Sequence, residues 1–339
     1  MKVFSIIIYS FLIFLISCQN DDDEKKSNAC NSNELLETFI TPNGEEIFIY
    51  KDGKLYTNKN GLCNFEFQYF EPNFLEENYV INGSGSFLKN RTGLFPTKNN
   101  FIENFENTSV FTDLFIHSLA DTDLYWTNIT LQSPATPTVS EYDALSKCIF
   151  DGTCSFIDNK IELISDPINA SNKVLKFTSV PPIANMVTSK SSIASTINFF
   201  TKDSNIWYKA DYYIESGIPF SIVDFENSYF FQSPGPRVII RDNKLEFENK
   251  FGAKLNIKNN SSITVPKKQW FTLKVHLKYS NENDGVIELW QDGVQIISES
   301  GINLPTSNSI QNVLEVGVSA SSEGCVLLFD NMRISETSF

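Results

Sequence analysis

The feature that most constrains the fold of this chain is the alternation of apolar and polar residues along short segments. In Trp270–Tyr279 the apolar residues Phe271, Leu273, Val275 and Leu277 are separated by polar ones. Asn, Asp, Gly and Pro interrupt such segments, and no long stretch has a helical period. Because a period of two puts successive side chains on opposite faces of a strand, the pattern predicts an all-β fold.

Residues 101–339 contain most of these segments and predict one large β-sandwich, of an ordinary size for a single all-β domain. The candidate strands are Phe101–Phe105, Lys160–Ile164, Lys173–Ser179, Ile193–Phe199, Ile206–Ile214, Phe220–Phe225, Arg237–Arg241, Lys244–Glu248, Trp270–Tyr279, Val286–Gln291, Val294–Ser298, Leu314–Ala320 and Val326–Ile334. The stretch Leu114–Tyr142, which contains two prolines, predicts a short helix near Asp113–Ala120 or a loop across the sandwich.

Residues 34–95 predict a small separate β module. They contain the candidate strands Glu46–Tyr50, Lys54–Thr57 and Asn64–Phe70, with a hairpin signal at Lys51-Asp52-Gly53. The segment after this module is rich in turn-forming residues and marks a domain boundary.

The N-terminus predicts export. Lys2 is followed by an apolar run that ends at Ser17, too short for a comfortable membrane span, which indicates a signal peptide over residues 1–17. The sequence Leu15-Ile16-Ser17-Cys18 resembles a bacterial lipobox, which implies that Cys18 becomes the lipidated first residue; an ordinary cleavage site is the alternative. No comparable run follows, so the lipid is the predicted membrane contact.

Residues 18–33 are polar and acidic and predict a flexible tether. An acidic cluster directly after the lipidated cysteine resembles the surface-export signal of Bacteroidetes lipoproteins, which implies an outer-membrane protein that faces the cell exterior. A plain solvated linker is the alternative.

Charge and composition exclude some functions. The chain has 41 acidic and 27 basic residues and a formal net charge of −14, which argues against nucleic acid as a partner. Two His and six Cys leave little room for a zinc site, and no cofactor is required by any motif.

Export makes disulfides permissible, and Cys18 is assigned to the lipid. Cys148 and Cys154 flank a short loop with an Asp-Gly turn and predict a local bridge. Cys30 and Cys63 form the next plausible pair. Cys325 lies in an apolar strand, which predicts a buried free thiol.

One segment carries a family resemblance. Residues 265–294 read as Trp270, a strand with a central His276, a turn ending at Gly285, a strand ending in Trp290, and an Asp-Gly turn. This pattern resembles concanavalin A-like jelly rolls, and within them the heparin-lyase-like and glucuronan-lyase-like polysaccharide lyases of bacteria. The segment Leu328–Ile334 resembles the last strand of such domains, so the resemblance implies a jelly-roll β-sandwich.

Catalytic residues cannot be carried over from that family. Its lyases carry an Arg-x-Glu strand and a Gln-containing strand that line the groove, whereas the corresponding segments here are Lys209–Tyr213 and Ile222–Asn227. Asp224 and Glu226 share a strand face, but they lack the third acid of the Glu-x-Asp-x-x-Glu strand of jelly-roll glycosidases.

Alternation instead predicts a glycan-binding outer face. Aromatic planes stack on sugar rings and cations contact carboxylates or sulfates. The candidate substrate-binding residues are Trp207, Lys209, Arg237, Arg241, Lys274, Glu288 and Trp290. If the protein is a lyase, His276 and Tyr213 are the candidate base and acid. The same residues also suit an ordinary polar surface.

The sequence therefore predicts a cell-surface lipoprotein that binds a polysaccharide through its jelly roll. The first alternative is a lyase that cleaves an acidic, uronate-containing glycan by β-elimination, and the second is a non-glycan adhesin or structural surface protein. Glu106 and Asp330 would be neighbours in this fold, and their oxygens would suit a structural calcium ion.

Overall fold

A computed structural model describes residues 98–339 apart from 118–120, 122, 199, 228–234, 252–255, 306–308 and 310. Before residue 98 it describes only the backbone of seven strands. The predicted signal peptide, Cys18, the tether and Cys30 lie outside the described residues, as does the side chain of Cys63, so lipidation and the Cys30–Cys63 bridge stay predictions. Within the described part, no helix is both long and apolar enough to cross a membrane.

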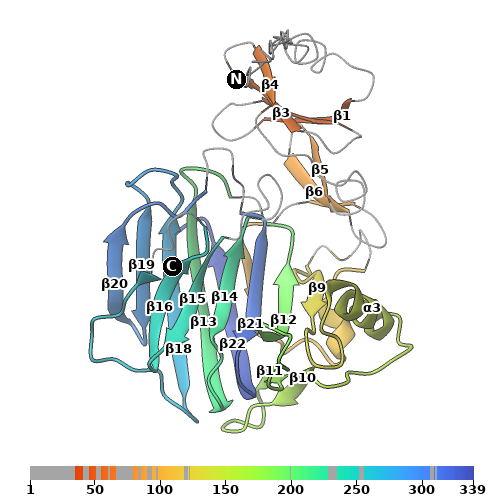
Figure 1. Cartoon of the computed structure of the whole chain (residues 1–339), viewed down its shortest axis with the longest axis vertical. Helices are drawn as coiled ribbons and strands as arrows, with labels where there is room; N and C mark the ends of the chain where they lie inside the picture. The colour runs from red at the N-terminus through yellow and green to blue at the C-terminus, as the bar shows by residue number, and fades with distance from the viewer. Residues whose placement is uncertain are drawn as a thin grey trace, which may run out of the picture.

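The large domain is a sandwich of two antiparallel sheets, as the alternation predicts (Figure 1). The eight-stranded sheet has the order β10 (Lys160–Ser165), β11 (Lys173–Ser179), β22 (Cys325–Ser335), β13 (Asn205–Ser216), β18 (Trp270–Lys278), β19 (Val286–Gln291) and β20 (Val294–Ser300), and β8 (Phe101–Glu103) also pairs with β22. The seven-stranded sheet has the order β17 (Asn256–Ile257), β16 (Lys244–Asn249), β15 (Pro236–Arg241), β14 (Ser221–Glu226), β21 (Val313–Ser321), β12 (Ser189–Ser195) and β9 (Asn128–Thr130). Strands distant in sequence are neighbours at the centre of each sheet, where β22 lies between β11 and β13 and β21 lies between β14 and β12, as in a jelly roll.

Two small antiparallel sheets precede the sandwich and are orange in Figure 1. The first contains β1 (Leu35–Ile40), β2 (Glu46–Tyr50), β3 (Leu55–Lys59) and β4 (Leu62–Phe65), and the second contains β5 (Tyr79–Asn82), β6 (Gly85–Lys89) and β7 (Leu94–Pro96). The division of the chain into a small module and a jelly roll stays a prediction.

The core lies between the two large sheets, where the alternating apolar residues meet. In β18, Phe271, Leu273, Val275 and Leu277 are at most 1% exposed, so the predicted inward face is confirmed. The inward faces of β13, β15 and β19 are confirmed in the same way. The outward side chains of all these strands are therefore free for other roles.

One irregularity in β14 turns two acidic residues outward. The register of β14 shifts between Ser221 and Val223 against both neighbouring strands. As a result Ile222 and Val223 both belong to the core, while Asp224 and Glu226 point to the outer face of the seven-stranded sheet. A β-bulge re-aims side chains in this way and is frequent next to functional sites.

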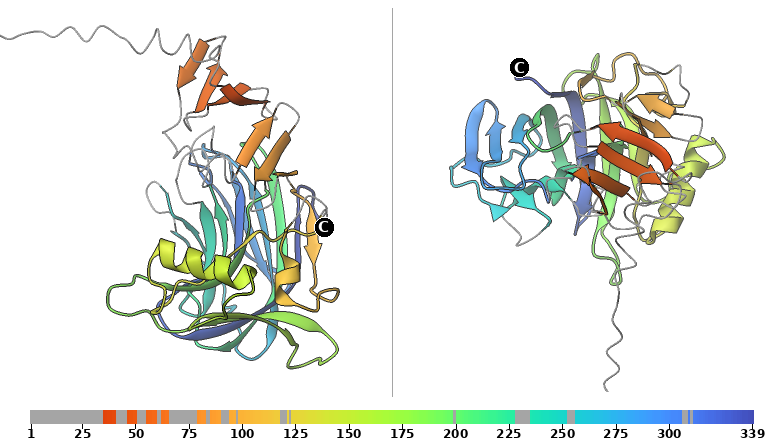
Figure 2. Two further views of the ribbon diagram at one scale, coloured as in Figure 1. Left: turned by 90° about the vertical axis from the view of Figure 1, so that its right-hand side faces the viewer. Right: turned by 90° about the horizontal axis from the view of Figure 1, so that it is seen from above.

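The helical elements differ from the expected ones. The segment near residue 113 forms only the short 3-10 helix η1 (Phe111–Leu114), and an α-helix, α3 (Val139–Phe150), forms where no helix was expected. The backbone N–H and the side-chain Oγ1 of Thr138 both donate to Glu141 Oε2, at 2.9 and 2.6 Å, in a capping box that starts the helix. Ser146 Oγ donates to Ile129 O at 3.0 Å and ties the helix to the β9 edge of the sandwich (Figure 2).

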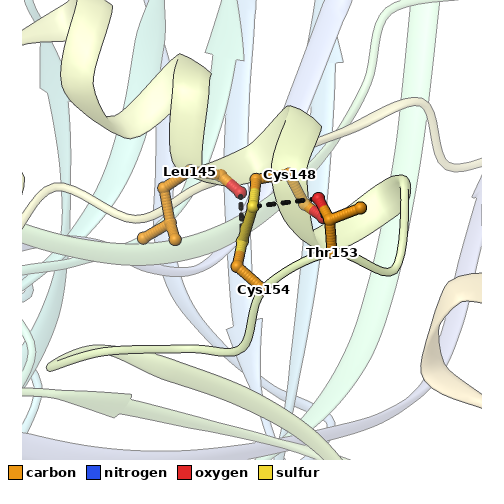
Figure 3. The surroundings of a disulfide bond; sticks show 4 residues. All are labelled: Leu145, Cys148, Thr153 and Cys154. Carbon is orange, nitrogen blue, oxygen red and sulfur yellow. Dashed lines mark hydrogen bonds between the residues drawn. A yellow bond between two sulfur atoms is a disulfide. The ribbon is translucent and has the colours of Figure 1, made fainter.

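A disulfide closes the loop that follows α3. Cys148 and Cys154 are bonded, with their Cα atoms 5.5 Å apart, and Thr153 Oγ1 lies 3.3 Å from Cys148 Sγ (Figure 3). Cys325 is a buried free thiol, and burial raises its pKa to about 11. Both cysteine predictions that fall in the described part agree with the structure.

We expect the variant Cys148→Ser/Cys154→Ser to lose about 2 kcal/mol of unfolding free energy, because a short closed loop restricts the unfolded chain. Urea denaturation of the variant and of the disulfide-intact protein measures the difference. Reducing the parent protein with dithiothreitol should reproduce the loss and leave the variant unchanged. Equal midpoints for all forms would show that the bridge does not stabilise the fold.

Candidate functional site

Charged side chains gather on the outer face of the seven-stranded sheet, which we call the charged face. They come from strands that alternate apolar inward residues with charged outward ones, and from the residue that follows β16. The charged face consists of Lys190, Asp224, Glu226, Arg237, Arg241, Glu246, Glu248, Lys250 and Glu315. Side chains of this kind are rarely buried unless they are paired, and here the four acids Asp224, Glu246, Glu248 and Glu315 are nearly inaccessible.

The centre of the charged face is a lysine held between two carboxylates. Lys250 Nζ donates to Asp224 Oδ1 at 2.6 Å and also to Glu226 Oε1. Ser221 Oγ donates to Asp224 Oδ2 at 2.7 Å, and Ser319 Oγ donates to the same oxygen. Asp224 is only 2% exposed, so its charge depends entirely on these partners.

The pKa values of the Asp224 and Glu226 carboxyl groups are shifted in opposite directions. Burial alone would raise the pKa of Asp224, but the charges of Lys250, Arg237 and Lys190 outweigh it and hold the pKa well below its usual range. For Glu226, burial raises the pKa above its usual value near 4.5 despite the pull of Lys250, and the Asp224 charge adds to the rise. The pKa of Lys250 is raised because its two anionic neighbours outweigh its burial. Asp224 is thus a fixed anion, whereas Glu226 is able to accept and release a proton.

The two arginines of β15 continue the charged face on one side. Arg237 contacts Glu248 at 2.6 Å through Nε and at 2.5 Å through Nη2. Arg241 Nη1 lies 3.0 Å from Glu246 Oε2, and its side chain is 33% exposed. Both guanidinium groups also lie over the ring of Phe220, at 4.9 and 5.9 Å. Arg241 is therefore the more accessible of the two cations.

Lys190 and Tyr142 lie on the other side, toward α3. Lys190 Nζ is 3.8 Å from Glu315 Oε2, and the charge of Glu315 raises the pKa of Lys190. Ser192 Oγ donates to Glu315 Oε1 at 2.5 Å. Burial raises the pKa of the Tyr142 phenol in α3, and the charges of Lys190 and Glu315 also act on this group. Tyr142 is thus a neutral proton donor beside a partly exposed cation.

This arrangement suits proton transfer on an anionic substrate. It offers a carboxylate whose pKa lies closer to neutrality, a neutral phenol, and two partly exposed cations, Lys190 and Arg241. Neighbouring groups whose pKa values are pushed apart are the usual mark of an acid–base site.

The structure divides the predicted substrate-binding residues between two opposite surfaces. Only Arg237 and Arg241 lie on the charged face; the others lie on the outer face of the eight-stranded sheet, on strands β13, β18 and β19. Those others are Trp207, Lys209, Lys274, Glu288 and Trp290. Because the apolar core separates the two surfaces, the prediction that all seven residues form one site is wrong.

The predicted acid–base pair is also too far apart to act together. His276 is paired in register with Trp207 and stacks on its ring at 3.8 Å, whereas Tyr213 is paired with Trp270 at the other end of β13. Six residues of strand separate Trp207 from Tyr213, or roughly 20 Å at the usual rise per residue. His276 Nδ1 contacts Glu288 at 2.8 Å and Nε2 contacts Asn205 at 3.0 Å, so both ring nitrogens have partners.

Sequence reasoning missed Lys190, Lys250, Glu315 and Tyr142. One signal was available in Lys244–Lys250, where every outward position is charged beside a strand with two outward arginines. Lys190 and Glu315 gave no such signal, because only the pairing of β12 with β21 brings them together.

The predicted calcium ligands Glu106 and Asp330 lie near each other beside the start of β11, where Lys173 N donates to Glu106 Oε1 at 2.9 Å. Burial raises the pKa of Asp330 to about 6, and the charges of Asp211 and Glu106 contribute to the rise. Asn172 Nδ2 donates to Asp330 Oδ2 at 2.8 Å. The available donors are oxygens, which calcium prefers, but in the described part of the chain no three acidic, His or Cys side chains form a metal-sized group.

Comparison with known proteins identifies a family. The profile of the family described as polysaccharide lyase matches residues 134–333, which include every residue of the charged face. None of the curated proteins matches the chain.

Three solved structures are similar to this chain at low sequence identity. An endo-β-1,4-glucuronan lyase from the fungus Trichoderma reesei is 13% identical, with a TM-score of 0.45, and the match covers 53% of this chain and 88% of that one. A cellulose-induced protein is 14% identical, with a TM-score of 0.44 and coverage of 70% and 97%. An alginate lyase from Chlorella virus is 9% identical, with a TM-score of 0.39 and coverage of 53% and 90%.

Proposed function

Because this chain belongs to the polysaccharide lyase family, we propose that it cleaves a uronate-containing polysaccharide by β-elimination at the charged face. The observation that carries the proposal is the pair Asp224 and Glu226, which share the cation of Lys250 and whose pKa values are shifted in opposite directions, inside the region that the family profile covers. The binding-only protein expected from the sequence becomes the alternative.

β-Elimination needs three groups. One neutralises the uronate carboxylate, a base removes the proton on the carbon next to that carboxylate, and an acid protonates the departing glycosidic oxygen. The electron pair of the broken C–H bond forms a carbon–carbon double bond as the C–O bond breaks. The products are a new reducing end and an unsaturated uronate.

The charged face and the neighbouring Tyr142 of α3 supply these groups. Lys190 is a partly exposed cation between the two proton-transfer groups and neutralises the carboxylate. Glu226 is the base, since its raised pKa strengthens it and Lys250 stabilises its ionised form. Tyr142 is the acid, because its raised pKa keeps it protonated at neutral pH. Arg241 binds a carboxylate of a neighbouring sugar unit.

The direct test is incubation of the full chain with alginate, polygalacturonate and polyglucuronate, and with dextran as a neutral polymer. A lyase produces a conjugated double bond that absorbs in the ultraviolet, together with shorter chains. Retention of a polymer in a native gel without new absorbance would favour the binding-only protein. The absence of both signals with every polymer would favour the adhesin.

We propose that calcium binds at Asp330 and Glu106 and stabilises the fold. The carboxyl of Asp330 is neutral below its pKa of about 6 and ionised above it, so calcium should raise the melting temperature more at about pH 8 than at about pH 5. Differential scanning fluorimetry with calcium or with EGTA measures this. Asp330→Asn should abolish the calcium effect, and identical melting temperatures with and without calcium would remove the proposal.

We also propose that the chain is an outer-membrane lipoprotein, anchored through Cys18 and exposed at the cell surface. The support is the lipobox-like sequence and the acidic tether that follows it. Metabolic labelling with a palmitate analogue should mark the parent chain and not Cys18→Ser. Protease treatment of intact cells then separates a surface location from an inward-facing one.

A further inference from the structure

A row of three cations without Asp or Glu partners crosses the outer face of the eight-stranded sheet. The register pairs Arg333 of β22 with Lys209 of β13, and Lys209 with Lys274 of β18. Among the described residues, no Asp or Glu side chain lies within ion-pairing distance of any of the three, although other lysines and arginines of the sandwich do form such pairs. Like charges directly opposite each other on neighbouring strands are destabilising. A chain with a net charge of −14 thus keeps an unfavourable cation row in one place.

Two acidic side chains of the same sheet, Asp211 and Glu288, are bound to other groups. Asp211 accepts from Thr272 and from Asn331 Nδ2, the latter at 3.0 Å. Glu288 contacts His276 at 2.8 Å and accepts from Gln295 Nε2 at 3.2 Å. Neither acid forms an ion pair with a cation of the row.

Aromatic rings accompany the cations. Lys274 Nζ lies 4.8 Å from the ring centre of Trp207 and 5.3 Å from that of Trp290, and Arg333 lies 4.1 Å over the ring of Phe339. Lys274 Nζ also donates to Phe339 O at 2.9 Å. The three rings are half-buried, so part of each remains accessible. Cations next to accessible aromatic rings suit a ligand that has both anionic groups and apolar sugar faces.

The row extends to apolar positions at both ends. Lys274 is paired with Trp290 of β19, and Arg333 is paired with Ile102 of β8, whose side chain is 65% exposed. Figure 1 shows β19, β18, β13 and β22 side by side in this sheet. A shallow cavity of about 660 Å³, lined by Arg333, Ile102, Phe101 and Thr337 among others, adjoins the β8 end. Five neighbouring strands span about 19 Å, enough for several sugar rings.

We propose that this cation row is a second, non-catalytic binding site for an acidic polysaccharide, on the surface opposite the charged face. The choice of a uronate polymer rests on the proposed lyase function, whereas the need for an anionic ligand rests on the row itself. Such a site keeps the polymer attached to the protein while another part of the same polymer, or a neighbouring chain, is cleaved.

The test uses the full chain with Glu226→Gln as the parent, so that the polymer is not degraded during binding. Affinity gel electrophoresis in alginate, polygalacturonate or polyglucuronate compares the parent with Lys209→Gln/Lys274→Gln. We expect the apparent Kd for the retarding polymer to rise at least about tenfold, as for the loss of charge-assisted contacts. Lys160→Gln, on the exposed side of β10 in the same sheet, is the matched control and should bind like the parent.

The outcomes separate this proposal from the lyase proposal. If the double variant with Glu226 intact cleaves short oligosaccharides at the parent rate but binds polymer weakly, both proposals are supported. If no polymer is cleaved but binding still depends on Lys209 and Lys274, the second site is supported without the lyase. Unchanged polymer binding by the double variant, no binding by the parent, or equal binding to dextran would each overturn the second site.

Discussion

Replacing Glu226 with glutamine is expected to lower kcat/KM on the cleaved polymer by roughly 10²–10⁴-fold, the usual contribution of a positioned base. Glutamine keeps the size of the side chain and its ability to accept from Gly235 N, a contact of 2.9 Å in the parent. It cannot accept the substrate proton. Since burial raises the pKa of Glu226, removal of its charge should leave the fold stable.

The pH profile gives a second readout of the same residue. Glu226 acts as a base only when ionised, so kcat/KM should rise with pH through a pKa above the usual 4.5. It should fall again only in alkali, where Tyr142 loses its proton at a pKa above 10. Residual activity of Glu226→Gln should lack the acidic limb and keep the alkaline one.

The matched control is Glu299→Gln, the same chemical change at an exposed position of β20 in the other sheet. Continuous ultraviolet absorbance measures both variants, and circular dichroism checks that both are folded. A folded Glu226→Gln that keeps activity within a few-fold of the parent, with an unchanged acidic limb, would remove Glu226 from the mechanism.

Replacing Lys250 with methionine is expected to cost about 3–5 kcal/mol of unfolding free energy, because it leaves the buried carboxylate of Asp224 and the half-buried one of Glu226 without their shared cation. The side chain of Lys250 is 15% exposed and that of Asp224 only 3%, so water replaces little of the lost interaction. Methionine approximates the length of the lysine stem, which limits the effect to the charge.

The loss of unfolding free energy in Lys250→Met should be larger at neutral pH than in acid. In the parent, the lowered pKa of Asp224 contributes stability above about pH 4 that disappears as the pH falls through the native pKa. In the variant, the unpaired carboxylates have raised native pKa values and destabilise the fold as the pH rises. The difference between parent and variant should therefore be largest near neutral pH and shrink in acid.

Lys278→Met is the matched control for this substitution. Lys278 Nζ lies 3.8 Å from Asp203 and 4.0 Å from Asp284, and its side chain is 35% exposed, so its loss should cost at most about 1 kcal/mol. Urea denaturation at several pH values measures both variants. Equal losses for Lys250→Met and Lys278→Met would show that the central lysine does not hold the two carboxylates in place.

The strand pattern was readable from sequence because alternation is a local property. The inward faces of β13, β15, β18 and β19 and the Cys148–Cys154 bridge were all predicted from residues close together in the chain. β12 (Ser189–Ser195) begins four residues before the predicted segment, because Ser191 and Ser192 occupy buried strand positions that hydropathy does not mark. Helix α3 was missed although its capping box, Thr138 with Glu141, was visible.

The site could not be located in the same way. Alternation shows that a side chain points outward, but not which of two sheets carries it. Trp207 and Arg237 both point outward, yet they lie on opposite surfaces because β13 and β15 belong to different sheets. The sequence by itself determined which residues face the core, since that depends on the period of two along each strand. Only the tertiary structure decided which charged residues meet, because Lys190, Glu226 and Lys250 come together through pairing between strands far apart in the chain.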